Sequence, residues 1–357
     1  MKDTPSNLLH ALALIFVCGG CVASDSCVGP ALTRGEAEAE AEAEAEAVPS
    51  PQPPATKAAE PALEGVLGER ARALVRASTF ADQAALIESR LRPSVRILPT
   101  RSTQEAIPLG ASRFAGLPDL PEGLAWPKRE EHPMALLAQI NLKDLAGRAP
   151  PGKLPATGWL YFFYSMEAST WGYDPKDADS FAVLYHDGPL ESLTRAAIPT
   201  GYGEAARSFS PSALSFTAAV DLPDPEDRRF PTELLSPGEN EKYDAWYALN
   251  AAVRDFDENR SPGHQLFGHP MMIQGPMREE CELVSKGTYT GRGYVPLPET
   301  EDAQARIDAW NLLLQLDSDR SGPGWMWGDM GRIYLWIRDE DLAARRFDRS
   351  WMHLYCY

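Results

Sequence analysis

The sequence predicts an α+β fold with mainly antiparallel sheets. Short apolar runs bounded by turn residues outnumber helical patterns, they often follow one another directly, and two pairs of them resemble each other. Strands that follow without an intervening helix pair antiparallel, because parallel neighbours need a long crossover connection. With 357 residues, 44% of them hydrophobic, the chain can bury a large core.

The folded part begins with a helical segment. Residues 67–92 have apolar spacing that suits one or two short amphipathic helices, and Pro93 ends them. A strand is expected from Val95. Residues 108–127 are rich in proline but contain one phenylalanine and one tryptophan, so we expect this run to lie ordered against the core.

The middle and the end of the chain contain two similar pairs of predicted strands. The pairs are Leu136–Ile140 with Gly158–Tyr164, and Leu312–Leu316 with Gly331–Ile337. A short helix is expected beside each pair, after the first strand in one pair and after the second in the other. The similarity therefore indicates a duplicated strand–loop–strand unit that is not a strict copy. Gln139 and Gln315 interrupt apolar strands, which predicts interior amides bonded to a neighbouring chain segment.

Four further elements complete the predicted domain. Strands are expected at Phe181–Tyr185 and Ala213–Thr217, and a closing strand at Trp351–Tyr357. Glu241–Phe256 predicts an amphipathic helix. Its apolar side is expected to consist of Tyr243, Trp246, Tyr247, Leu249 and Val253.

The first 24 residues predict an export signal. The apolar run Leu8–Val17 has signal-peptide length and is too short for a permanent membrane span. Small residues precede Cys21, which resembles a bacterial lipoprotein signal with Cys21 as the lipidated residue. Cys18 stands where that signal usually has an aliphatic residue, so ordinary cleavage near Ala23 is the alternative. The prediction is an exported protein of the cell envelope, whose membrane contact is a lipid anchor.

Residues 25–66 predict a disordered linker. Residues 35–47 alternate glutamate and alanine, and residues 49–61 are rich in proline and alanine. The first stretch lacks the apolar variety that a core needs, and the prolines of the second prevent a helix. We expect this linker to act as a spacer that lets the following domain, residues 93–357, extend away from its point of attachment.

Charge and cysteines narrow the function classes. The formal net charge is −17, which opposes binding to nucleic acid, because that binding needs a basic face. Two cysteines, Cys281 and Cys356, lie in the predicted domain. They are either a disulfide of an oxidising compartment or two buried free thiols.

Several motifs in order resemble the YwqG-like family. They are Ser112–Pro118 with Trp126–Pro127, Leu137–Ile140, His264–Pro270, Leu314–Asp319, and Trp327–Asp329. Two departures are Ala115, where the family tends to have a second glycine, and His269, where it often has tyrosine. The resemblance covers residues 93 to 357 and implies an α+β domain of unknown activity, with no catalytic residues to carry over.

One acidic loop is the candidate site for chemistry. Asp317, Asp319 and Asp329 lie close together after a predicted strand, and carboxylate oxygens are ligands for Ca²⁺ or Mg²⁺. With His264 they form the hypothesis of a metal-assisted enzyme with a divalent cation. The alternative is that Asp317 and Asp319 cap backbone amides in a turn, and that His264 is a structural histidine.

Aromatic residues suggest a second kind of site, a glycan-binding face. The residues concerned are Trp159, Tyr161, Phe162, Phe163, Tyr164 and Trp171. The alternative is that most of them pack in the core. The sequence contains no nucleophile elbow, phosphate-binding loop or paired-histidine zinc motif. It therefore favours a non-catalytic binding module, with a protein or glycan partner, over an enzyme.

Overall fold

The computed structural model describes residues 65–167, 170–255, 262–293, 295–297 and 299–357. The predicted export signal and the linker up to residue 64 lie outside the described residues and stay predictions. Within the described ranges, no helix is both long and apolar enough to cross a membrane.

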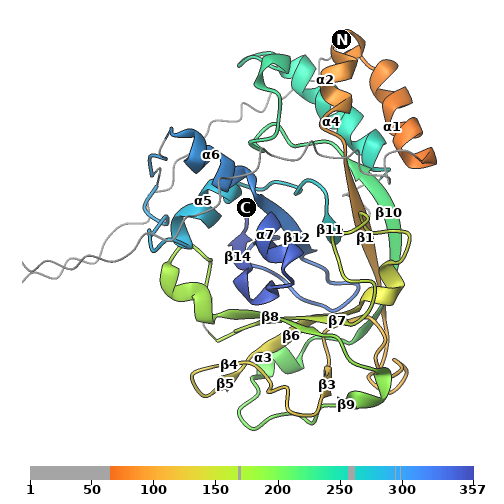
Figure 1. The fold of residues 1–357 in the computed structure, drawn as a ribbon, viewed down its shortest axis with the longest axis vertical. Helices are drawn as coiled ribbons and strands as arrows, with labels where there is room; N and C mark the ends of the chain where they lie inside the picture. The colour runs from red at the N-terminus through yellow and green to blue at the C-terminus, as the bar shows by residue number, and fades with distance from the viewer. Residues whose placement is uncertain (1–64, 168–169, 256–261, 294, 298) are drawn as a thin grey trace, which may run out of the picture. The chain divides into compact units, whose positions relative to one another are not determined.

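A ten-stranded sheet organises the domain (Figure 1). All its neighbouring strands pair antiparallel, which confirms the predicted fold class. In spatial order the strands are β14 (Trp351–Tyr355), β13 (Arg332–Arg338), β12 (Trp310–Asp317), β11 (Gln265–Phe267), β1 (Arg92–Arg101), β10 (Ser212–Asp221), β2 (Arg113–Phe114), β6 (Ala135–Asn141), β7 (Trp159–Tyr164) and β8 (Phe181–His186).

Two small sheets, seven α-helices and six short 3-10 helices make up the other regular elements of the described ranges. The small sheets pair β3 (Asp119–Pro121) with β9 (Leu193–Arg195), and β4 (Lys128–Arg129) with β5 (His132–Pro133). The helices are α1 (Val66–Arg76), α2 (Ala84–Glu88), α3 (Glu204–Arg207), α4 (Asn240–Arg254), α5 (Met277–Val284), α6 (Glu301–Asp308) and α7 (Asp339–Ala343).

The large sheet consists of two related halves. Its strand order is symmetric about the β1–β10 pair, so that β11, β12, β13 and β14 on one side correspond to β2, β6, β7 and β8 on the other. In each half a glutamine pairs with a tyrosine of the next strand, Gln139 with Tyr161 and Gln315 with Tyr334. A bulge interrupts both pairs of strands two residues before the glutamine. The predicted duplication is thus present, and the pairing of residues between neighbouring strands is also the same in both halves.

The two glutamines make equivalent hydrogen bonds. Gln315 Oε1 accepts from Met271 N (2.9 Å), and its Nε2 donates to Gly263 O (2.5 Å). Gln139 makes the same two bonds, 2.6 and 3.0 Å long, to the equivalent residues of its own half. Both side chains are fully buried, so each satisfies two main-chain groups that water does not reach. The prediction of interior amides is confirmed.

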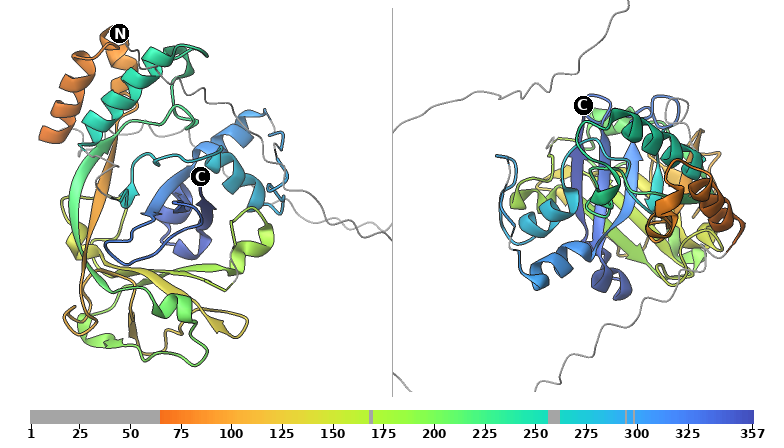
Figure 2. Two further views of the ribbon diagram at one scale, coloured as in Figure 1. Left: turned by 180° about the vertical axis from the view of Figure 1, so that it is seen from behind. Right: turned by 90° about the horizontal axis from the view of Figure 1, so that it is seen from above.

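The halves of the sheet share one hydrophobic core. The sheet is strongly twisted and curls so that the β6–β8 strands lie across from the β12–β14 strands (Figures 1 and 2). Ring contacts join the halves: Phe181 lies 5.8 Å from Trp351, and Phe114 lies 5.2 Å from Trp325, between centroids. Burial of these large aromatic side chains supplies much of the stabilising area.

The aromatic strand β7 is buried on both faces. None of its five aromatic side chains is more than 3% exposed. One face joins the shared core, and the other packs under Leu120 and Leu193 of the β3–β9 sheet. The glycan-binding face predicted for these residues is therefore wrong for β7, because a second layer covers it. Of the predicted group, Trp171 alone is exposed, at 40%.

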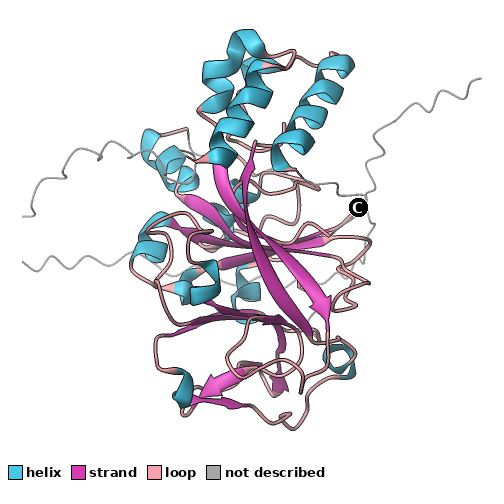
Figure 3. Ribbon diagram, turned by 90° about the vertical axis from the view of Figure 1, so that its right-hand side faces the viewer, coloured by secondary structure: helices cyan, strands magenta, loops and turns pink. Residues whose placement is uncertain are grey.

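A helical layer lies at one end of the long β1–β10 ribbon (Figure 3). Helix α4 buries Trp246, Leu249 and Val253 against α1, α2 and the end of β10. The predicted helix Glu241–Phe256 is present as Asn240–Arg254, and Phe256 lies outside the described residues. Tyr247 is 47% exposed, so its predicted place on the apolar side is wrong.

Tertiary structure, and not the local sequence, determines two of the short strands. Strand β11 has only three residues and β2 only two, and turn residues follow both, so the sequence patterns predicted no strand at either place. Each is nevertheless held in register between two longer strands.

The two cysteines of the predicted domain do not form a disulfide. Cys281 and Cys356 are both free thiols, the first buried and the second partly exposed.

Candidate functional site

The acidic loop at the end of β12 forms a closed hydrogen-bond network. Asp317 Oδ2 accepts from Gly263 N (2.8 Å), and its Oδ1 lies 3.1 Å from Arg332 Nε. His264 Nδ1 accepts from Asp317 N (3.0 Å), and its Nε2 lies 3.3 Å from Asp319 Oδ2. The fold thus brings together three of the four predicted site residues.

The second aspartate of the loop is equally occupied by protein donors. Asp319 Oδ1 accepts from the amides of Ser321 and Gly322, at 2.8 Å each. Burial opposes ionisation, but the hydrogen bonds from His264, Gly322 and Ser321 prevail and hold the pKa of Asp319 well below its usual value. These contacts are those of a turn in which carboxylates cap amides.

Asp329 does not join the network. It is exposed, and its main-chain carbonyl accepts from Tyr357 N (3.1 Å). Among the described residues, no group of three or more histidine, cysteine, aspartate or glutamate side chains has a spacing that could hold a metal ion. The geometry of Asp317, Asp319 and His264 favours the structural alternative over the divalent-cation site.

The other half of the sheet supports this reading of His264. By register, Ser112 is its equivalent, and Ser112 Oγ accepts from Asn141 N at 2.9 Å, as His264 Nδ1 accepts from Asp317 N. Two different side chains therefore close the same turn. An acceptor at this position is what the fold requires.

A basic pocket lies at the end of β11, where Phe267 and Gly268 line it. The acidic loop contacts the chain at the other end of β11, at Gly263 and His264. Ten residues line it: Arg92, Pro93, Pro150, Lys153, Arg229, Phe267, Gly268, Asn311, Leu312 and Leu342. It is a small cavity of about 30 Å³ that opens to solvent. Three of the lining residues are cationic and none is acidic. In a chain of net charge −17 this is an unusual concentration of positive charge.

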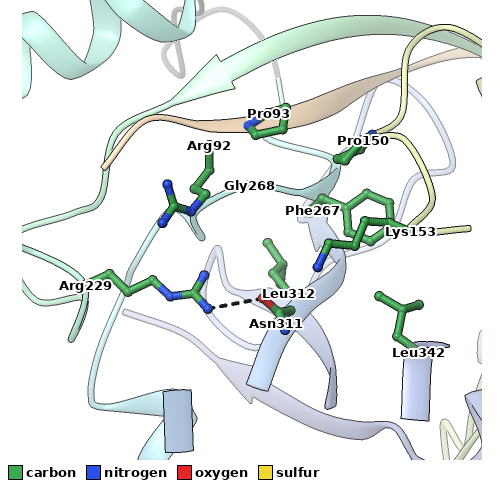
Figure 4. A pocket seen from close by; sticks show the side chains of 10 residues that line it. All are labelled: Arg92, Pro93, Pro150, Lys153, Arg229, Phe267, Gly268, Asn311, Leu312 and Leu342. Atoms are coloured by element: carbon green, nitrogen blue, oxygen red, sulfur yellow. Dashed lines mark hydrogen bonds between the residues drawn. The ribbon is translucent and has the colours of Figure 1, made fainter. Parts of the chain in front are cut away.

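Three segments far apart in the sequence supply the cations, which point into the same space (Figure 4). Arg92 begins β1, Lys153 lies in the loop before β7, and Arg229 lies in the loop after β10. Arg229 Nη2 donates to Asn311 Oδ1 (3.1 Å), while Asn311 Nδ2 donates to Ala309 O (2.8 Å). Asn311 thereby fixes the guanidinium at the pocket wall.

The cations at the pocket also contact protein acceptors. Arg92 Nη1 donates to the main-chain carbonyls of Ser89 (3.0 Å) and Leu91 (2.7 Å). Lys153 Nζ lies 3.0 Å from Asp339 Oδ1 at the rim, and that carboxylate is 42% exposed. Burial lowers the pKa of Arg229 to about 9, and the charges of Arg278 and Arg92 add to this lowering. An anion in the pocket would relieve that electrostatic cost.

The equivalent place in the other half of the sheet is apolar. The registers of β1, β11 and β12 match those of β10, β2 and β6, and they place Phe209 where Arg92 lies and Ala135 where Asn311 lies. Phe209 and Ala135 belong to a small hydrophobic cluster with Tyr202. The fold can therefore fill this position with apolar side chains. A cation at the position of Arg92 is therefore not required by the architecture.

The pocket can bind an anion but holds few groups for chemistry. Its ten lining side chains include guanidinium, ammonium and amide groups, and no carboxylate, imidazole, thiol or hydroxyl. General acid–base catalysis near neutral pH and nucleophilic attack usually need one of those groups. Guanidinium groups instead match the oxygen pairs of phosphate and carboxylate.

Sequence patterns did not reveal this pocket. Arg92, Lys153, Arg229 and Asn311 come from four separate segments, and none belongs to a recognisable motif. The adjacent pair Arg228–Arg229, set in an otherwise acidic stretch, is the one local pattern in the sequence that could have indicated a basic site.

Fold and pocket define the class of the protein: an internally duplicated α+β domain with a cationic pocket beside β11. The chain belongs to the family described as a domain of unknown function, DUF1963, which matches residues 112–356. The match includes every strand of the ten-stranded sheet except β1. No curated protein matches the chain.

Proposed function

We propose that this DUF1963 domain is a non-catalytic binding module whose ligand presents an anionic group to Arg92, Lys153 and Arg229. The observation that carries the proposal is the internal comparison: the residues equivalent to Arg92 and Asn311 in the other half belong to an apolar cluster. Convergent like charges destabilise a fold, and such costs are typical of functional sites. The absence of acid–base groups from the lining favours binding over catalysis.

The test is calorimetric titration of the full-length chain with inorganic phosphate at low ionic strength. We expect Arg92→Gln and Lys153→Gln each to weaken binding by about tenfold or more, since each removes one charge-assisted hydrogen bond. Arg349→Gln is the matched control, because its side chain is 69% exposed and lies outside the pocket lining. Equal affinities in all four proteins, or no phosphate binding at all, would refute the proposal.

The proposal includes display of this module from the bacterial cell envelope. It rests on the export signal of residues 1–24, with Cys21 as the lipidated residue, and on the spacer that follows. Cell fractionation is the check: the parent chain is expected with the membranes, and Cys21→Ser is expected to release it in soluble form. Recovery of the parent in the cytosol would overturn this part. Within the family, the ordered motifs also favour a YwqG-like member.

A further inference from the structure

We infer that the anionic group which the pocket accepts is a diphosphate. This inference rests on the proposed function and names the ligand class of the same site. It starts from a second hollow that adjoins the pocket and is lined by Arg90, Arg92, Arg228, Arg229 and Asp308. Arg92 and Arg229 line both spaces, so their guanidinium groups form the wall that the two spaces share.

The outer hollow is also cationic. Four of its five lining residues are arginines. Its one acid, Asp308, is already bonded to Arg228 Nε at 2.8 Å, and Arg229 Nη2 donates to its main-chain carbonyl. Pocket and hollow together are lined by five cationic side chains and one carboxylate. Two further carboxylates contact these cations: Asp339 Oδ1 lies 3.0 Å from Lys153 Nζ, and Glu279 Oε1 lies 3.4 Å from Arg228 Nη1.

Arg90 has hydrogen-bonding capacity to spare. Its Nε is buried without a hydrogen-bond partner, although the residue as a whole is only half-buried. The main chain at Arg90 is fixed, because its carbonyl accepts from His269 Nε2 at 2.8 Å. An unsatisfied buried donor costs about 1–3 kcal/mol. Arg90 also lines the outer hollow, so its side chain is available to an anion there.

The wall shared by the two spaces sets how far apart the two anionic groups of a ligand can be. If Arg92 and Arg229 contact both groups, the groups must be adjacent. Carboxylates on one face of an extended acidic peptide lie about 7 Å apart, at every second residue. The two phosphoryl groups of a diphosphate share a bridging oxygen and present adjacent sets of acceptors to guanidinium forks. The arrangement therefore favours a diphosphate over an acidic peptide.

The experiment compares inorganic diphosphate with inorganic phosphate on the full-length chain, by calorimetry with chelator present. We expect diphosphate to bind at least about tenfold more tightly, and Arg90→Gln to remove that advantage while phosphate binding stays within about twofold. A nucleoside diphosphate and a prenyl diphosphate serve as further ligands. If either binds more tightly than inorganic diphosphate, it identifies the kind of molecule that carries the group.

The outcomes separate the two proposals. If phosphate binds in the pocket but diphosphate binds no more tightly, or if Arg90→Gln weakens both equally, the diphosphate inference is wrong and the binding function stands. If neither anion binds, both fail. Thermal unfolding of Arg90→Gln shows whether the variant is folded, and Arg349→Gln again controls for the loss of one exposed arginine.

Discussion

Gly268→Ala is expected to destabilise the domain by about 3–5 kcal/mol, the cost of breaking a buried ion pair. Gly268 has a φ of +73°, and a Cβ there would lie 2.1 Å from Asp221 Oδ2 and 2.7 Å from Ser94 Cβ. Asp221 is fully buried and accepts from Arg96 Nη2 at 2.6 Å. The carboxylate cannot move without losing that bond.

The matched control is Gly123→Ala. Gly123 has a similar φ of +84°, but no atom lies within 4 Å of the place its Cβ would occupy. It reports the backbone cost alone, about 1–2 kcal/mol for a left-handed non-glycine residue. Urea unfolding of both variants measures the difference. Equal losses would mean that the contact with Asp221 does not hold the turn.

Gln315→Leu is expected to cost about 2–6 kcal/mol, because it leaves two buried main-chain groups without partners at about 1–3 kcal/mol each. Those groups are the amide of Met271 and the carbonyl of Gly263. Leucine keeps the volume of the side chain nearly unchanged, so little of the effect comes from a cavity. Equilibrium unfolding in urea provides the measurement.

Two further variants test the explanation. Gln139→Leu removes the equivalent bonds of the other half and is expected to give a loss of similar size. Gln274→Leu removes an exposed amide that donates to Cys356 O, and surface changes of this kind stay within about 0.5 kcal/mol. A Gln315→Leu protein as stable as Gln274→Leu would contradict the role given to the buried amides.

The duplicated turns explain a local departure in the sequence. Ala115 has a φ of +54° and Gly116 follows at +74°; in the other half Phe267 is at +59° and Gly268 at +73°. Two consecutive left-handed residues are costly for side chains, which accounts for a preference for glycine at the position of Ala115. The strands on either side hold these left-handed turns in place. In the half that contains β11, the turn places Phe267 and Gly268 in the lining of the basic pocket.

Local patterns alone determined the fold class, most strands and the duplication. Short apolar runs, turn residues and the repeated glutamine are properties of neighbouring residues, so they can be recognised along the chain. The same patterns grouped His264, Asp317 and Asp319, which the fold brings together, with Asp329, which lies apart from them. The patterns left open whether these residues bind a ligand, because hydrogen bonds to Gly263, Ser321 and Gly322 depend on how the turns close.

Tertiary structure alone decided the rest. Burial of β7 on both faces follows from the β3–β9 layer, which no pattern within β7 indicates. Strands β2 and β11 are too short to be recognised and exist because longer neighbours hold them. The basic pocket joins Arg92, Lys153 and Arg229 across more than a hundred residues of chain. The field of converging charges depends on distances in space, and spacing along the sequence does not record them.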